Sequence, residues 1–316
     1  MKMNKNSLIF FVCTAVLCII PLIVSSDYSR HLCVNALIYV ILAQGLNICL
    51  GYCGQLSLGQ AGFYALGGYV FAILTTGLDF SWWGAAVIAV VITTLIGFLL
   101  SAISMRSRGG AFIIITILFA SVVKIVTLNW TEVTNGQAGI LSVPGMTFFG
   151  NQLTSKIEIY YYVLVFVIIM QFLTWRMVDS KIGRGFIAVG QDEILASSLG
   201  ISPYHYSIAA FTIGAAFSAF AGCLHASFAQ MVSPEMSDFN NVMLYLIMMV
   251  VVGGRGTLWG PVAGAFIFTF LPEYLRLADI LRIPILGMIL ILLVLFIPEG
   301  IIPALTKLTR KIKDIR

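Results

Sequence analysis

Long apolar runs separated by short polar connections dominate this chain. A helix needs about 20 apolar residues to cross the hydrocarbon core of a bilayer, and about ten segments approach or reach that length. They cover residues 7–25, 33–50, 61–78, 82–104, 111–128, 159–178, 205–229, 239–253, 260–275 and 283–297. The last three are short enough to be re-entrant or buried instead of spanning. Because the runs are continuous and do not alternate with polar residues, they predict helices.

The composition agrees with this pattern. Of the 316 residues, 60% are hydrophobic and only 10% are charged, whereas soluble domains carry about 25% charged residues. The mean hydropathy is +1.01. The chain therefore needs the lipid bilayer as its solvent, and we expect a single all-α polytopic membrane domain over residues 1–316. The modest excess of 18 Lys and Arg over 13 Asp and Glu forms no basic stripe, so nucleic acid is not an expected partner.

The distribution of positive charge predicts the orientation of the segments, because cytoplasmic loops carry an excess of Lys and Arg. With ten spans and both termini in the cytoplasm, thirteen of the 18 Lys and Arg residues lie inside, four lie outside and Lys124 falls within a segment. We therefore expect an N-in, C-in arrangement. Lys2 and Lys5, followed by the apolar stretch to Val24, also resemble a secretory signal peptide. An uncleaved first helix is the favoured alternative.

Two connections are longer than the others. Residues 129–158 lie outside in this topology, and residues 179–204 lie inside and form the most charged internal stretch. A weak similarity between Gly54–Gly59 and Gly256–Gly260 could mark two related halves, as internal repeats do in transporters. A two-fold repeat and the absence of one are equally compatible with this similarity.

Several kinds of chemistry are missing from the sequence. It has no phosphate-binding loop for ATP and no motif of catalytic residues. His31, His205 and His225 lack the spacing of metal ligands, and the six cysteines are interpreted as small hydrophobic residues. The segments contain no clear interior Asp or Glu, which argues against proton coupling and more weakly against sodium coupling. We therefore expect no catalytic site, no metal and no cofactor on this chain.

Polar side chains inside or between the segments are candidates for a translocation pathway. Gln44 and Asn47 lie three residues apart on one helical face, and Asn35 is expected close to the same face. Such amides either hold helices together or line a polar cavity, and both alternatives stay open. Ser57 and Gln60 follow in a stretch whose glycines break the helix, so we expect them to line the pathway.

Lys124 is the one ionisable side chain well inside a segment. It lies five residues, or about 7.5 Å along a helix, from polar Asn129. Snorkelling of its ammonium to the membrane surface is therefore favoured, with a role in the pathway as the alternative.

The inner connection contains the sharpest local signal. Residues 191–199 are predicted to form a short amphipathic helix. Asp192 and Glu193 stand near its start, where the helix dipole favours anions, and Gly200 stands past its end. A short helix with defined ends on a membrane domain is typical of a docking element. The alternative, a solvated linker, would hardly need such signals.

At this connection the sequence resembles the permeases of ABC importers, and most closely the branched-chain amino acid (LivM-type) family. The matching residues are Gly183, Arg184, Ala188, Asp192, Glu193, Ala196, Gly200 and Ile201. A second match runs from Gly54 to Phe63. The third and most specific match runs from Ser233 to Ala265 and includes Gly253, Gly254, Gly256 and Gly260.

Four positions depart from the family pattern. Ile187 and Gly190 stand where such permeases often carry basic residues, and Gln60 and Gly62 replace the usual His and Ala. The first two changes affect the electrostatics expected for docking. The last two leave the exact substrate open.

The resemblance implies the permease subunit of an importer in the bacterial inner membrane. A second permease would pair with the chain, and an external solute-binding protein would deliver leucine, isoleucine or valine. Two ABC ATPase subunits, which bind the ATP and magnesium, would dock on the inner connection. The residues implied in docking are Gly183, Arg184, Asp192, Glu193, Ala196 and Gly200. The alternatives are an ABC permease for urea, amides or other amino acids and, less favoured, an ion-coupled secondary carrier.

Overall fold

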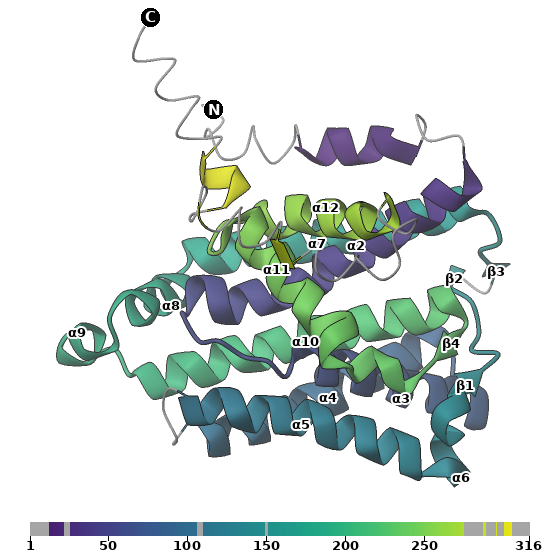
Figure 1. Cartoon of the computed structure of the whole chain (residues 1–316), viewed down its shortest axis with the longest axis horizontal. Coiled ribbons are helices and arrows are strands. Elements are labelled where there is room, and N and C mark those ends of the chain that lie inside the picture. The colour runs from purple at the N-terminus through teal and green to yellow at the C-terminus, as the bar shows by residue number, and fades with distance from the viewer. Residues whose placement is uncertain are drawn as a thin grey trace, which may run out of the picture.

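A computed structural model describes residues 13–21, 26–105, 110–148, 151–274, 287–288, 295 and 300–304. In these residues the chain is a bundle of helices with short strands at one end (Figure 1). Residues 13–21 are helical. The longer helices that follow are α2 (Asp27–Asn47), α3 (Gln60–Gly77), α4 (Trp82–Ser104), α5 (Gly110–Asn129), α7 (Lys156–Asp179), α10 (Pro203–Ala229), α11 (Leu244–Gly254) and α12 (Gly260–Tyr274).

The described helices coincide with the predicted segments. From 33–50 to 260–275, each predicted segment lies on a helix whose ends differ by a few residues. Among the described residues, five helices are long and apolar enough to cross a membrane, namely α2 with its extension to Tyr52, α4, α5, α7 and α10. The chain is therefore a multi-pass helical membrane protein. Most of the predicted segment 283–297 and both ends of segment 7–25 lie outside the described residues.

Burial separates the central helices from the peripheral ones. In the 18-residue apolar stretches of α2 and α10, 83% and 72% of the residues are buried, whereas in those of α4 and α5 only 28% are buried. The outward faces of α4 and α5 carry large aliphatic residues such as Val87, Val91, Leu118 and Val122. Such broad apolar surfaces are rare on soluble proteins, and we assign these faces to the lipid.

Close packing of α3 against α10 forms the centre of the bundle. A Cβ atom at Gly222 would lie 2.0 Å from the carbonyl oxygen of Tyr64, and one at Gly67 would lie 2.5 Å from that of Ala219. Lipid provides no hydrophobic driving force between helices, so small residues that let backbones approach supply the packing energy. The two helices can approach this closely because the glycines have no side chains, and no larger residue would fit at these positions.

The two long connections lie at opposite ends of the bundle (Figure 1). One end carries α8 (Lys181–Gln191) and α9 (Glu193–Ser198). The other carries α6 (Thr131–Thr134), the short 3₁₀ helix η2 (Gly136–Ala138) and the strands β1 (Ile140–Leu141), β2 (Thr147–Phe148), β3 (Asn151–Gln152) and β4 (Met231–Val232). β1 pairs antiparallel with β4, and β2 pairs antiparallel with β3. The expectation of an all-α fold missed these two small sheets, because two-residue strands leave no periodic pattern.

Two stretches of the bundle interrupt the helical pattern. α2 continues into the π-helical turn η1 (Ile48–Tyr52), after which residues 53–59 are non-helical until α3 begins. After α10, the chain passes through β4, the 3₁₀ helix η3 (Pro234–Ser237) and a second π-helical turn, η4 (Phe239–Met243), before α11. π-Helical turns inside helices occur frequently at functional sites, which directs attention to these two stretches.

The α3–α10 contact predicts a large difference between two glycines. We expect Gly222→Ala to lower the free energy of unfolding by about 1–3 kcal/mol, because the added methyl group overpacks the helix crossing. Gly77→Ala, at the end of α3, is the matched control, since nothing lies within 4 Å of the Cβ it would add. Thermal unfolding in detergent measures both. Equal unfolding temperatures for the two variants would contradict the proposed packing.

Candidate functional site

The non-helical segment 53–59 has buried ends, whereas Gly54 in its first half is exposed. Cys53 and Ser57 are completely buried. The backbone N–H of Leu58 donates a 3.1 Å hydrogen bond to the Thr116 hydroxyl of α5, and the N–H of Gly59 donates to the Ser57 hydroxyl at 3.3 Å. Backbone at membrane depth must be satisfied by protein when it leaves a helix. Ser57, a predicted pathway residue, therefore contributes to the support of this segment.

Gln60 joins three elements at the start of α3. Its Oε1 accepts a 2.6 Å hydrogen bond from the Ser218 hydroxyl of α10, and its Nε2 donates to the Cys49 Sγ in η1 at 3.6 Å. Gln60 is fully buried. Nearby Gly62 is confined as well, because a Cβ there would lie 3.0 Å from the Ala120 Cα of α5. These two departures from the family pattern thus stand in a tightly packed junction.

Asn47 clamps the loop between α11 and α12. Its Oδ1 accepts a 2.9 Å hydrogen bond from the backbone N–H of Gly256, and its Nδ2 donates to the Thr257 carbonyl oxygen at 3.0 Å. Asn47 is fully buried. Of the two alternatives for the amides, holding elements together describes the contacts of Asn47.

Asn35 and Gln44 have different surroundings. Asn35 lines a cavity of about 140 Å³ together with Tyr39, Asn241 and Tyr245. The Gln44 amide is buried and has no hydrogen-bond partner among the described residues. The expectation that Asn35 shares a face with the other amides is wrong, because nine helical residues turn the chain by roughly half a revolution beyond whole turns.

The four motif glycines build the turn between α11 and α12. A Cβ at Gly253 would lie 2.0 Å from the Gly260 carbonyl oxygen, and one at Gly260 would lie 2.2 Å from that of Gly254. Gly254 and Gly256 have φ angles of +122° and +69°, which disfavour any residue with a Cβ. The glycines therefore allow a sharp turn at a close helix contact.

The inner connection folds as two short helices, α8 and α9. The Ser180 hydroxyl caps α8 by accepting from the N–H groups of Ile182 and Gly183. The Asp192 carboxylate caps α9 by accepting from the N–H groups of Ile194 and Leu195 at 2.8 and 3.0 Å. The predicted short helix is thus confirmed as α9, with Asp192 as its N-cap. The Ser180 cap was the sequence signal for α8, which the prediction missed.

The other predicted docking residues have distinct places in this pair of helices. The Arg184 guanidinium donates to the Asp179 carbonyl oxygen at 3.1 Å. Gly183 lies at the tight turn out of α7, where a Cβ would come within 2.4 Å of Val178 backbone atoms. Ala196 is buried, and Gly200 ends α9 with a φ of +82°.

The helix pair contacts the non-helical segment directly. The Glu193 carboxylate accepts a 2.6 Å hydrogen bond from the Gln55 side-chain amide. Gly190, at the end of α8, packs on the same stretch, since a Cβ there would lie 2.6 Å from the Tyr52 carbonyl oxygen. A basic side chain at position 190 would not fit this contact, which accounts physically for one departure from the family pattern.

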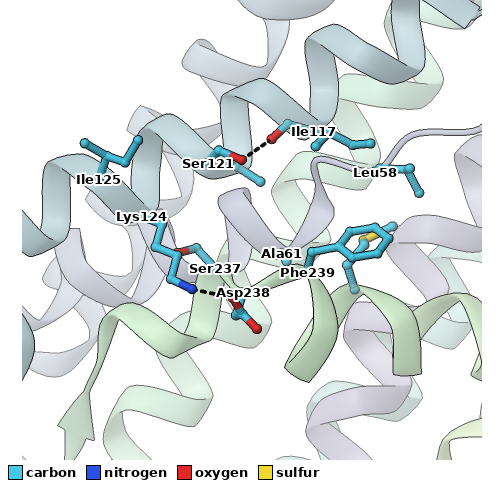
Figure 2. A pocket seen from close by; sticks show the side chains of 11 residues that line it. Leu58, Ala61, Ile117, Ser121, Lys124, Ile125, Ser237, Asp238 and Phe239 are labelled. Carbon is cyan, nitrogen blue, oxygen red and sulfur yellow. Dashed lines mark hydrogen bonds and ion pairs between the residues drawn. The ribbon is translucent and has the colours of Figure 1, made fainter. Parts of the chain in front are cut away.

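Lys124 forms an ion pair with Asp238, the residue that precedes η4 (Figure 2). The Lys124 ammonium thus has a partner on another element, which neither alternative for Lys124 had included. Asp238 also caps η4, since its Oδ2 accepts from the Asn241 N–H at 3.3 Å. Sequence reasoning missed Asp238, whose only signal was its position just before an apolar run. In the described part of the chain, no cluster of His, Cys, Asp and Glu could hold a metal ion.

Multi-pass helical domains with interrupted helices are common among membrane transport proteins, and this chain has both features. The family model described as the permease component of branched-chain amino acid transport systems matches residues 30–298. The chain belongs to this family of permease components, which are the non-catalytic transmembrane subunits of ABC transporters. No solved structure gave a significant match.

Similar proteins carry the same description. The chain is 32% identical to the high-affinity branched-chain amino acid transport system permease protein LivM of Salmonella typhimurium, over 93% of this chain and 74% of that protein. It is 33% identical to LivM of Escherichia coli, over 88% and 70%. The permease protein BraD of Pseudomonas aeruginosa is 24% identical over 84% of this chain and 91% of its own length.

The Asn47 clamp predicts a specific loss of stability. Asn47→Ala would leave the Gly256 N–H and the Thr257 carbonyl without their partner, and buried polar groups left unpaired cost about 1–3 kcal/mol. Asn35→Ala is the control, since the Asn35 Oδ1 has no partner among the described residues. Unfolding temperatures in detergent compare the two. A smaller shift for Asn47→Ala than for Asn35→Ala would contradict the clamp.

Proposed function

We propose that this chain is the subunit through which an ATP-driven importer moves leucine, isoleucine or valine across the bacterial inner membrane. Membership of the permease family and the similarity to two LivM proteins of branched-chain amino acid transport support this substrate class. The chain works with a second permease, an external solute-binding protein and two ABC ATPase subunits. ATP and magnesium bind to those ATPases and not to this chain.

The exposed apolar surface of α9 is the main structural support for this proposal. Ile194, Leu195 and Leu199 are 84%, 59% and 72% exposed, although α9 stands at an end of the bundle, away from the apolar faces of α4 and α5. Clustered apolar residues on a projecting helix are typical of a protein interface. We assign this surface to the ATPase subunit.

The contacts of α8 and α9 define how force would reach the membrane domain. A shift of α9 acts on Gln55 through Glu193, and a shift of α8 acts on Gly54 through Gly190. Both push on segment 53–59, which leads directly into α3. Packed elements of this kind shift between discrete arrangements and transmit small displacements, so ATP binding in the partners would move the start of α3.

Docking of the ATPases on the inner connection implies one orientation of the chain in the membrane. Residues 179–204 lie in the cytoplasm with the ATPases, and residues 129–158 lie outside, where the binding protein docks. The positions of the two connections at opposite ends of the bundle support this assignment, as does the excess of Lys and Arg predicted inside. Both termini are then cytoplasmic.

Reconstitution tests the function. The tagged chain is purified from mild detergent with its partners, and leucine uptake is measured in proteoliposomes with the binding protein present. We expect an ABC ATPase and a second permease to copurify with the chain. We expect leucine uptake only when ATP is enclosed in the proteoliposomes. Uptake by the chain alone, driven by an ion gradient, would instead identify a secondary carrier. ATP-driven uptake of urea or amides but not of leucine would identify a permease for another solute.

A charge on the docking surface should separate the ATPase from the permease. We expect Ile194→Asp to prevent copurification of the ATPase, because it places an unpaired carboxylate at the centre of an apolar interface. Its unfolding temperature should stay unchanged, since Ile194 is exposed. Gln137→Asp, an exposed residue of η2 at the opposite end of the bundle, is the control. Retention of the ATPase by Ile194→Asp would contradict the proposed docking.

The contact between Glu193 and Gln55 should control coupling. We expect Gln55→Glu to reduce leucine uptake per ATP hydrolysed, because two carboxylates would face each other across the former hydrogen bond. Glu193→Gln keeps a neutral hydrogen bond and should keep most of the coupling. Combining both changes restores a carboxylate–amide pair with the partners exchanged. Failure of the double variant to recover uptake would show that the pair does not transmit the movement.

A further inference from the structure

A small cavity lies where the two interrupted stretches of the bundle meet. Its volume is about 200 Å³, below the roughly 300–1,000 Å³ of sites for drug-sized ligands. Leu58 belongs to the first interrupted stretch, and Ser237, Asp238 and Phe239 belong to the second. α5 closes the remaining side. Discontinuous helices are where transporters commonly place the sites for their solutes.

One end of this cavity is charged. The Lys124 ammonium pairs there with the Asp238 carboxylate (Figure 2), and their side chains are 37% and 18% exposed. The Ser121 hydroxyl lines the cavity above the pair and donates its hydrogen to the Ile117 carbonyl oxygen. A cation and an anion side by side are the groups that recognise the α-carboxylate and α-ammonium of an amino acid.

The rest of the cavity is apolar. Leu58, Ala61, Ile117, Phe239 and Met243 line it, and Figure 2 shows Leu58 and Phe239 on the side away from the ion pair. An aliphatic side chain would be buried there favourably. A charged side chain would lose its solvation without gaining a partner.

We propose that this cavity binds the transported amino acid as a zwitterion, with its carboxylate on Lys124, its ammonium on Asp238 and its aliphatic side chain against Leu58, Phe239 and Met243. This inference rests on the proposed function and adds the substrate-contacting residues to it. Lys124 and Asp238 neutralise each other in their ion pair, which avoids an uncompensated charge in the cavity. Substrate binding exchanges one ion pair for two, so total charge in the cavity is unchanged.

The position of Lys124 fits a site within the membrane. It lies on α5, a candidate membrane span, fourteen residues after Gly110 and five before Asn129. At about 1.5 Å per residue, these distances are about 21 Å and 7.5 Å along the helix. In the proposed orientation the cavity is nearer the outside, where a binding protein would release the solute.

Thiol protection in the assembled transporter tests the binding directly. Ser121→Cys places a thiol in the cavity, and Val122→Cys, on the next and exposed residue of α5, is the matched control outside it. We expect millimolar leucine to slow maleimide labelling of Cys at 121 and not at 122. Leucinamide lacks the carboxylate and 4-methylpentanoate lacks the amine, so each should require about tenfold more for the same protection. Equal protection by all three compounds, or protection by none, would overturn the proposal.

Reversal of the ion pair separates substrate binding from structural support. Lys124→Asp combined with Asp238→Lys keeps an ion pair while it exchanges the positions of the two charges. Because it also removes the Asp238 cap of η4, its unfolding temperature is measured alongside to show that the variant is folded. In the Ser121→Cys background, we expect that leucine no longer protects the thiol of this variant from maleimide. We also expect its leucine uptake to fall about tenfold. Full uptake and protection would show that the pair is only a structural clamp. If the unaltered transporter takes up leucine with ATP but leucine gives no protection, the site is wrong and the proposed function stands.

Discussion

The non-helical backbone of residues 53–59 is the constraint on which the rest of the structure depends. Inside a bilayer, backbone that leaves a helix needs partners from the protein, and here Thr116 and Ser57 supply them. Gln60 then fixes the start of α3 to α10 through Ser218. The segment therefore leads into a helix whose start is fixed to the centre of the bundle.

The same segment connects three regions that are far apart in the sequence. Gln55 binds α9, Leu58 lines the cavity with the Lys124–Asp238 pair, and Gly51, just before the segment, lies close to Gly256 in the turn between α11 and α12. A displacement of the docking helices would therefore reach both the cavity and the α11–α12 turn. In the proposed transporter, this one short interruption would couple events on the ATPase subunits to the binding of the solute.

The sequence predicted what depends on local pattern. Helix positions follow from continuous apolar runs, and the short helix α9 follows from Asp192 and Gly200 at its ends. The partners of polar residues could not be predicted, because they depend on tertiary contacts. Lys124 meets Asp238 across 114 residues, and Asn47 meets Thr257 across 210. Gly190 likewise appeared as a missing positive charge, although its backbone contact with Tyr52 leaves no room for a side chain.

Hydrogen–deuterium exchange of residues 53–61 in the assembled transporter tests whether segment 53–59 connects docking of the ATPases to transport. Exchange is compared between the nucleotide-free and ATP-bound states, with Glu193→Gln and Gln55→Glu as companions. We expect ATP binding to change amide exchange in residues 53–61 and 254–260, and Gln55→Glu to abolish that change while Glu193→Gln preserves it. Unchanged exchange in both segments of a transporter that imports leucine would contradict the role of segment 53–59 as the connection between docking and transport.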